Sequence, residues 1–362
     1  MHHHKFLPEP IPQAMDLIHK FLNLAAPTFT FFCFFFFLLP FYFFKSLKSI
    51  FSTIFSENLA CKVVLITGAS SGIGEHLAYE YGKRGARLSL AARRLNRLQE
   101  VADMARELGS PQVLTIQADV SKRNDCKSMV DQTINHYGRL DHLVNNAGIG
   151  SFSMFEETTD VDVFRKLMDT NFWGSVYTTY FAVPHLKESN GKIIAISSAA
   201  SWLPTPRMAF YNASKAAVKS FFETLRVELG NQIQITIVTP GFIESELTQG
   251  KILSGEGEMR VDQEIRDVMV STTPVGSVSG CAKAIVNSAC RGDRYLTQPS
   301  WYKMTYVWKV FWPEMVEWHF RLFYLTHPSR RDFPLGKMIL DITGSQQVLY
   351  PSSTQSSEIK TD

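Results

Sequence analysis

Tyr211 and Lys215 are the residues of this sequence whose types and spacing could do chemistry. They stand four positions apart in Tyr211-Asn212-Ala213-Ser214-Lys215, on one face of a helix that the sequence predicts through Leu229. A phenol has a pKa of about 10 and carries protons poorly at neutral pH unless a nearby cation favours its ionised form. Because Lys215 supplies such a cation, we expect it to lower the pKa of Tyr211 and make the phenol a general acid–base.

Ser197 and Ser198 follow a β-branched run at 192–196 that predicts a strand. A hydroxyl at the end of that strand can hold a substrate oxygen and stabilise the charge that develops on it. Each of these residues alone is more often structural. Together with Tyr211 and Lys215, they predict a site that moves a proton to or from a substrate oxygen.

A glycine-rich turn lies between a predicted buried strand at 63–66 and a predicted helix through Tyr81. Its sequence is Thr67-Gly68-Ala69-Ser70-Ser71-Gly72-Ile73-Gly74. Strand, glycine-rich turn and helix in this order are typical of a dinucleotide site, because the glycines allow a tight turn and a close approach to the pyrophosphate. The helix N-terminus adds free N–H groups and a favourable dipole. We therefore predict that this turn binds a dinucleotide cofactor.

Arg93 and Arg94 end the second predicted strand, at 87–92. NAD enzymes place an acid here against the ribose 2′-hydroxyl, whereas NADP enzymes place an arginine against the 2′-phosphate. The sequence has no acid at this point, which favours NADP(H), although two arginines could also simply begin a solvated helix. Two further strand ends complete the predicted cofactor edge: Asp119 and Val120 after 113–117, and Asn145 to Gly148 after 140–144.

These motifs, with Pro240-Gly241, resemble those of the short-chain dehydrogenase/reductase superfamily over about residues 61–297. The resemblance implies one Rossmann-type, doubly wound parallel sheet of the α/β class, and hydride transfer between a nicotinamide and a secondary alcohol or ketone. It implies that Tyr211 is the acid–base, that Lys215 tunes it and binds the nicotinamide ribose, and that Ser198 rather than Ser197 holds the substrate oxygen. Asn171 would hold a water that relays the proton. The implied cofactor-binding residues are Gly68, Ser70, Ser71, Gly72, Ile73, Gly74, Arg93, Arg94, Asp119, Val120, Asn145, Ala147, Gly148, Tyr211, Lys215, Pro240, Gly241, Ile243 and Ser245.

The whole chain is also similar to the plant 11β-hydroxysteroid dehydrogenase-like proteins, the steroleosins. The similarity covers a phenylalanine-rich segment with two prolines, residues 51–58 and residues 241–255. It implies a lipid-droplet (oil-body) or endoplasmic-reticulum location, a proline-bearing hairpin in a lipid monolayer, and sterol or steroid-like substrates. The superfamily further implies a homodimer formed by the helices around Asn171 and Tyr211.

The segment from Leu24 to Phe44 has no charged residue and reaches the roughly twenty apolar residues that cross a bilayer. No small-residue processing site follows it, which predicts an uncleaved anchor. Pro27 and Pro40 leave two arrangements open, a kinked spanning helix or a monolayer hairpin, and a buried core helix is a third. The lysines that follow the segment favour a catalytic domain on the cytosolic side.

Composition divides the 362 residues into five parts. Four tryptophans of the aromatic part stand among charged residues, which indicates either a packed lid or core extension, or a contact with a membrane surface. The parts are a flexible leader (1–14), a membrane or lipid-droplet anchor (15–58), the Rossmann domain (59–300), an aromatic helical extension (301–349) and a disordered tail (350–362).

Several partners and groups are excluded by composition. A net charge of +3 without basic runs argues against nucleic acid. The five scattered cysteines lack metal-site spacing and fit a reducing compartment better than a disulfide framework. No metal site is expected, and His2, His3 and His4 read as part of the flexible leader.

Two kinds of function remain. The first is a membrane-anchored NADP-dependent oxidoreductase acting on a lipophilic alcohol or ketone, with either a steroid or another lipid ketone as substrate. The second is a lipid-droplet coat or sterol-sensing protein that binds cofactor without needing turnover. The full set of Asn171, Ser198, Tyr211 and Lys215 favours the enzyme, because a coat protein needs none of it.

Overall fold

The computed structural model describes residues 12–54, 56–325 and 334–355, and the chain divides into two units after Ser56. In its described residues the first unit is one helix, α1 (Pro12–Ile54), which continues through Pro27 and Pro40. Its stretch Met15–Leu47 has 33 residues, and the most apolar 18-residue window in it has a mean hydropathy of 2.0 and no buried residue. The helix is therefore long and apolar enough to cross a membrane, and its exposure distinguishes it from a core helix. The histidines at positions 2 to 4 lie outside the described residues.

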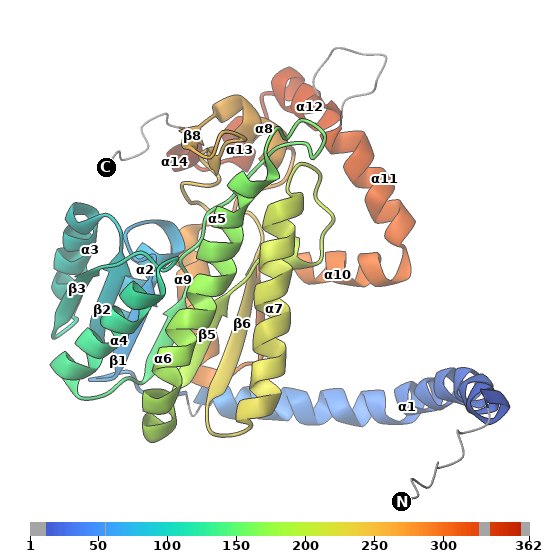
Figure 1. The fold of residues 1–362 in the computed structure, drawn as a ribbon, viewed down its shortest axis with the longest axis horizontal. Coiled ribbons are helices and arrows are strands. Elements are labelled where there is room, and N and C mark those ends of the chain that lie inside the picture. Colours follow the sequence, from blue (N-terminus) through green and yellow to red (C-terminus); the bar gives the residue numbers. More distant parts are fainter. Residues whose placement is uncertain (1–11, 55, 326–333, 356–362) are drawn as a thin grey trace, which may run out of the picture. The chain divides into compact units, whose positions relative to one another are not determined.

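A seven-stranded sheet forms the centre of the second unit (Figure 1). Its order is β3-β2-β1-β4-β5-β6-β9, and all neighbouring strands are parallel. The chain winds outward in both directions from β1 and β4, which opens a crevice at the carboxyl ends of the strands. This confirms the predicted doubly wound α/β fold. The strands are β1 (Val63–Thr67), β2 (Arg87–Ala92), β3 (Val113–Gln117), β4 (His142–Asn145), β5 (Lys192–Ile196), β6 (Gln234–Pro240) and β9 (Tyr295–Gln298).

Helices cover both faces of this sheet. Figure 1 shows α4, α6 and α7 in front of the strands, whereas α2, α3 and α9 pack on the other face. The front helices are α4 (Arg123–Tyr137), α6 (Gly174–Ser189) and α7 (Ala209–Leu229). The others are α2 (Gly72–Gly82), α3 (Leu95–Glu107) and α9 (Val278–Arg291).

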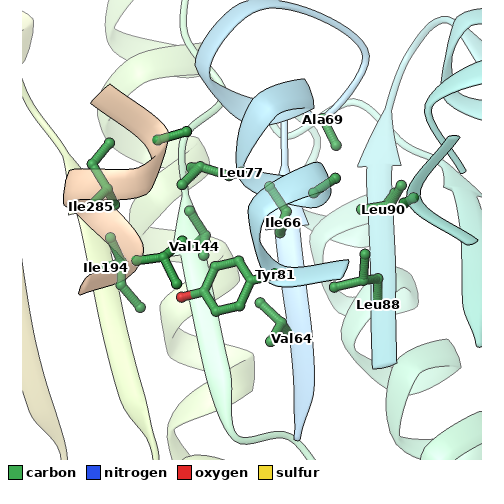
Figure 2. Close-up of a cluster of buried hydrophobic side chains, with 14 of the residues drawn as sticks. Val64, Ile66, Ala69, Leu77, Tyr81, Leu88, Leu90, Val144, Ile194 and Ile285 are labelled. Atoms are coloured by element: carbon green, nitrogen blue, oxygen red, sulfur yellow. The ribbon is translucent and has the colours of Figure 1, made fainter. Parts of the chain in front are cut away.

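The hydrophobic core explains why the strands read as continuous apolar runs. Successive side chains of a strand point to opposite faces, so a sheet covered on both faces needs apolar residues at every position. Val64 and Ile66 of β1 pack with Leu77 and Tyr81 of α2 and with Ile285 of α9 (Figure 2). Val63 and Leu65 of the same strand are buried on the opposite side.

The remaining elements follow the carboxyl ends of the strands, and η2, η3, α10, α11, β7 and β8 among them contribute residues to the cavity described below. Pro313 begins α11, and α11 packs against both α10 and α12. The helices are α5 (Arg165–Leu167), α8 (Gln263–Val270), α10 (Tyr302–Phe311), α11 (Pro313–Tyr324), α12 (Leu335–Thr343), α13 (Gln346–Leu349) and α14 (Ser352–Gln355). The short turns are η1 (Val161–Phe164), η2 (Met168–Trp173) and η3 (Ala199–Ser201), and β7 (Lys251–Leu253) pairs antiparallel with β8 (Met259–Val261).

Residues 350–355 differ from the disordered tail that the sequence predicts from position 350 onward. The Tyr350 side chain is buried and its hydroxyl donates to Ser271 O at 2.7 Å. The buried Arg266 donates through Nη1 to Thr354 O at 2.7 Å. Because a buried guanidinium needs acceptors, this contact helps to hold the segment in place. Residues 356–362 lie outside the described part of the chain.

Candidate active site

A cavity of 1470 Å³ opens at the carboxyl edge of the sheet. The ends of β1 to β6 line one side of it, and α10 and α11 line another. Of the residues that the sequence predicts for the site, the cavity is lined by Gly68, Ser70, Ser71, Gly72, Ile73, Arg93, Arg94, Asp119, Val120, Ala147, Gly148, Ser198, Tyr211, Lys215, Pro240, Gly241, Ile243 and Ser245. The lining does not include Gly74, Asn145 or Asn171.

The glycine-rich turn has the shape that a dinucleotide needs. Gly68 has a φ of +65°, which favours glycine, and a Cβ there would stand 2.7 Å from Ala147 Cα. A Cβ at Gly74 would stand 2.2 Å from Gly68 O. Gly74 therefore lets α2 approach the turn closely, which explains its place behind the cavity wall. Backbone left uncovered at the start of a helix fits the pyrophosphate of a dinucleotide.

Asn146, which lies in the predicted turn after β4 but is not among the predicted binding residues, holds the glycine-rich turn in place. Its Nδ2 donates to Thr67 O at 3.0 Å and to Gly68 O at 3.1 Å, and its own N donates to Thr67 Oγ1 at 3.0 Å. Asn145, which was predicted to bind cofactor, is buried and donates through Nδ2 to Thr179 Oγ1 on α6 at 2.8 Å. Neighbouring residues at a strand end face opposite ways, so Asn146 lines the cavity and Asn145 does not.

Tyr211, Lys215 and Ser198 come together at the catalytic end. The first two are buried on one face of α7, and Ser198, which follows β5, has its hydroxyl beside the Tyr211 phenol. Lys215 Nζ lies 5.9 Å from the centre of the Tyr211 ring and donates to Ile196 O at 3.1 Å. Ser197 instead donates to Lys215 O at 2.8 Å, so it supports α7. The geometry thus selects Ser198 over Ser197 as the hydroxyl beside the tyrosine.

Burial sets the direction in which the pKa of each catalytic group is shifted. It raises the pKa of Tyr211 to about 12, although the nearby Ser198 hydroxyl acts to lower it. It also lowers the pKa of Lys215 to about 8. The net shift of the tyrosine pKa is therefore upward, opposite to the lowering that the sequence predicts, because desolvation disfavours the charged form of both groups. A neutral phenol at pH 7 is the protonation state that reduction of a ketone requires.

Asn171 holds the helix that carries the site rather than lining the cavity itself. It lies in η2, a π-helical turn, and is 1% exposed. Its Oδ1 accepts from Ile149 N at 2.8 Å, and its Nδ2 donates to Ser214 Oγ at 2.9 Å. A π-helical turn inside a longer helical segment often marks a functional position. Ser214, a buried partner next to Lys215, was not predicted from the sequence.

The side of the cavity formed by the glycine-rich turn, here called the cofactor wall, continues to the end of β2. Arg94 precedes α3 and donates through Nη2 to Ser71 Oγ at 3.0 Å, whereas Arg93 is exposed beside it. At the end of β3, Asp119 accepts from Ser121 N at 3.0 Å. Two residues of this region were missed because no motif marks them, Glu246 and Thr248 in the loop after β6.

The opposite wall is apolar and aromatic. Trp308, Trp312 and Met315 line the cavity, yet each also keeps about half or more of its surface exposed. The four-tryptophan segment thus forms part of a wall, as the lid interpretation predicts, and also presents apolar side chains outward. The other apolar or aromatic lining residues on this side include Leu203, Met208, Trp301, Tyr302, Val316, His319, Phe320 and Tyr324.

Comparison with known proteins identifies the class. The family model described as short chain dehydrogenase matches residues 62–253, and the chain belongs to this family. It is therefore related to oxidoreductases that use a nicotinamide cofactor. Each of the motifs in β1, β5 and α7 lies within the matched residues.

Plant proteins are similar over nearly the whole chain. The 11-beta-hydroxysteroid dehydrogenase 1A of Arabidopsis thaliana is 64% identical over 96% of this chain and 100% of its own length. The 11-beta-hydroxysteroid dehydrogenase A of Sesamum indicum is 61% identical over the same shares. The 11-beta-hydroxysteroid dehydrogenase of Pinus massoniana is 49% identical over 86% of this chain and 88% of its own length.

Solved structures share the fold. A short-chain dehydrogenase/reductase from Burkholderia phymatum in complex with NAD has a TM-score of 0.64 at 23% identity, covering 72% of this chain and 96% of that one. An alcohol dehydrogenase from Thermococcus sibiricus complexed with 5-hydroxy-NADP has a TM-score of 0.54 at 25% identity, covering 66% and 95%. One neighbour carries NAD and the other an NADP derivative, so likeness of fold leaves the choice between the two cofactors open.

Proposed function

We propose that this protein is a membrane- or lipid-droplet-anchored, NADP-dependent oxidoreductase that interconverts a secondary alcohol and a ketone on a steroid-like substrate. The observation that carries the proposal is one cavity that joins Ser198, Tyr211 and Lys215 to an aromatic wall from α10 and α11. The names of the plant relatives support a hydroxysteroid as substrate.

Each catalytic side chain has a distinct task in this proposal. A bound nicotinamide supplies or accepts the hydride. The Ser198 hydroxyl holds the substrate oxygen, and Tyr211 gives that oxygen a proton in reduction or takes one in oxidation. Lys215, with its pKa near 8, supplies positive charge beside the phenol when the tyrosine loses its proton. Asn171 positions this group through Ser214.

The preference for NADP(H) rests on charge at the end of β2. Both Arg93 and Arg94 line the cavity there, and neither β2 nor the two residues after it carries an acid. A guanidinium binds the 2′-phosphate of NADP(H), which NAD(H) lacks. Arg94 also contacts Ser70 and Ser71, so it belongs to the wall that would hold the cofactor and not merely to a solvated helix.

Exposed apolar surface supports the proposed location and the proposed assembly. The apolar stretch of α1, whose most apolar window has no buried residue, supports anchoring in a membrane or a lipid-droplet monolayer, and a lipophilic substrate would then enter from the lipid. Tyr180 on α6 and Val227 on α7 are 66% and 78% exposed, which supports a homodimer through that helical face. We also propose that the catalytic domain lies on the cytosolic side of the membrane.

The test is oxidation of a panel of steroid and sterol alcohols by the detergent-solubilised full chain, with NADP⁺ and NAD⁺ compared. We expect turnover of at least one hydroxysteroid and a higher kcat/KM with NADP⁺. Turnover only of lipid alcohols that lack the steroid ring would indicate that the substrate is another lipid alcohol or ketone. Cofactor binding without turnover of any panel member would contradict the enzymatic proposal and favour a coat or sensor role.

A further inference from the structure

An ion pair joins two walls of the cavity at the end of β2. Arg94 directly precedes α3, whereas Glu246 lies in the loop between β6 and β7. Arg94 Nη1 donates to Glu246 Oε1 at 2.7 Å, and the two side chains are only 17% and 22% exposed. At this distance the contact is a short, charge-assisted hydrogen bond in a partly desolvated place.

The loop holds Glu246 in position. The Thr248 hydroxyl is buried and donates to Ile243 O at 2.9 Å, and it accepts from Ser245 N at 2.9 Å. Nearby, Glu244 N donates to Gly276 O at 3.0 Å. Because these bonds fix the backbone on both sides of position 246, the carboxylate is presented to Arg94 by a folded loop.

Arg94 also hydrogen-bonds with the glycine-rich turn. Its Nη2 donates to Ser71 Oγ at 3.0 Å and to Ser70 Oγ at 3.3 Å, both in the glycine-rich turn. Glu246 has a second cation, because Lys251 Nζ lies 3.1 Å from its Oε2. The guanidinium thus connects the turn that would bind the pyrophosphate with a fixed carboxylate from the substrate-side loop.

A carboxylate and a phosphate bind a guanidinium through the same planar N–H groups. A 2′-phosphate that approaches Arg94 must therefore share the guanidinium with Glu246 or displace it, and the carboxylate also repels a second anion. A cofactor with a free 2′-hydroxyl brings no charge to this point. The carboxylate therefore weakens binding of the phosphorylated cofactor selectively.

We infer that Glu246 is a specificity-determining residue, whose carboxylate competes with the 2′-phosphate for Arg94 and so limits the preference for NADP(H) over NAD(H). The inference rests on the proposed NADP-dependent function and adds the residue that sets the size of the preference. Lys251 weakens this competition, because its ammonium group attracts the second carboxylate oxygen of Glu246. Removing the charge at position 246 should therefore increase the preference for NADP(H) over NAD(H).

The test measures binding without turnover. The dissociation constants of 2′,5′-ADP and 5′-AMP are determined by calorimetry for the full chain in detergent, as wild type and as Glu246→Gln. These two probes differ by the 2′-phosphate alone. We expect the ratio of affinities, 2′,5′-ADP over 5′-AMP, to rise by roughly threefold or more in Glu246→Gln, the effect of one partly exposed charge pair. An unchanged or lower ratio would overturn the inference.

Two further variants separate the possible failures. Glu244→Gln is the matched control, because this carboxylate in the same loop accepts from Val278 N at 3.0 Å and so faces α9; its affinity ratio should equal that of wild type. Arg94→Met should bring the ratio down toward one. If Arg94→Met lowers the ratio but Glu246→Gln leaves it unchanged, Glu246 does not compete with the 2′-phosphate. The proposal that Arg94 selects NADP(H) would then be retained. If Arg94→Met leaves the ratio unchanged, both the role of Glu246 and the proposal that Arg94 selects NADP(H) are wrong.

Discussion

At the scale of single residues, the sequence predicts positions well where spacing fixes geometry. Tyr211 and Lys215 share a helical face at a separation of four, and they do lie together in the cavity. The choice between Asn145 and Asn146 could not be made in the same way, because it depends on which face of β4 each residue meets. The pKa of Tyr211 could not be predicted either, since burial rather than Lys215 dominates it.

Gly74 offers a test of the close contact between α2 and the glycine-rich turn. In Gly74→Ala the new Cβ would meet Gly68 O at 2.2 Å and Asn146 Nδ2 at 2.5 Å, so backbone must move. We expect a loss of about 1–3 kcal/mol in the free energy of unfolding, and weaker binding of 5′-ADP. Thermal unfolding and calorimetry measure the two effects.

Gly255→Ala is the matched control, because a Cβ at that position meets no heavy atom within 4 Å. Its unfolding midpoint and its affinity for 5′-ADP should equal those of wild type. A Gly74→Ala protein that behaved like this control would show that α2 does not need the close approach.

At the scale of elements, the strands of the sheet could be predicted because burial on both faces gives them unbroken apolar runs. β8 could not, since its three residues are all exposed and are too few to show a pattern. The end of the chain was also missed, because residues 350–355 are fixed by the carbonyl that Thr354 offers to Arg266. Such contacts depend on residues far apart in sequence, which local patterns do not reveal.

A buried polar cluster fastens the segment before β1 to the amino-terminal ends of the strands. Glu57 Oε2 lies 2.7 Å from Lys192 Nζ on β5 and 3.1 Å from His142 Nε2 on β4. The other ring nitrogen of His142 lies 3.0 Å from the Tyr81 hydroxyl. Burial raises the pKa of Glu57, but the contacts with His142 and Lys192 outweigh it and hold the pKa well below its ordinary value of 4.5.

Glu57→Gln should therefore destabilise the fold in a pH-dependent manner. A carboxylate whose pKa is lower in the folded state stabilises that state above its unfolded pKa, and this stabilisation declines as the pH falls. We expect a loss of about 1–3 kcal/mol in the free energy of unfolding at pH 7, and a smaller loss at pH 4. Urea denaturation at the two pH values measures it.

Glu317→Gln serves as the comparison, because its side chain is 55% exposed and its ion pair with Arg321 lies in solvent. Its effect should stay below about 1 kcal/mol at both pH values. An equal loss for Glu57→Gln at pH 7 and pH 4 would show that the charge of Glu57 does not stabilise the fold.

At the scale of the whole molecule, the sequence predicts an apolar anchor, as a kinked helix or a hairpin, followed by one α/β domain. The structure has a long apolar helix in the first unit and the α/β fold in the second. The cavity itself could not be predicted, because its walls come from the strand ends, the loop around Glu246 and the helices α10 and α11. Sequence motifs identify the catalytic and cofactor ends. The aromatic wall that suits a lipophilic substrate becomes visible only in the folded chain.

The central claim, that Tyr211 transfers the proton in an alcohol–ketone interconversion, is tested most directly by kcat of Tyr211→Phe with NADP⁺ and a steroid that wild type oxidises. We predict a loss of about 10²- to 10⁴-fold, because the phenol carries the proton of the substrate oxygen. The affinity for 2′,5′-ADP should be unchanged, because this probe lacks the nicotinamide half of the cofactor. Tyr137→Phe, whose hydroxyl donates to Leu88 O at 2.8 Å away from the cavity, should keep nearly full turnover. Full turnover by Tyr211→Phe would contradict the account.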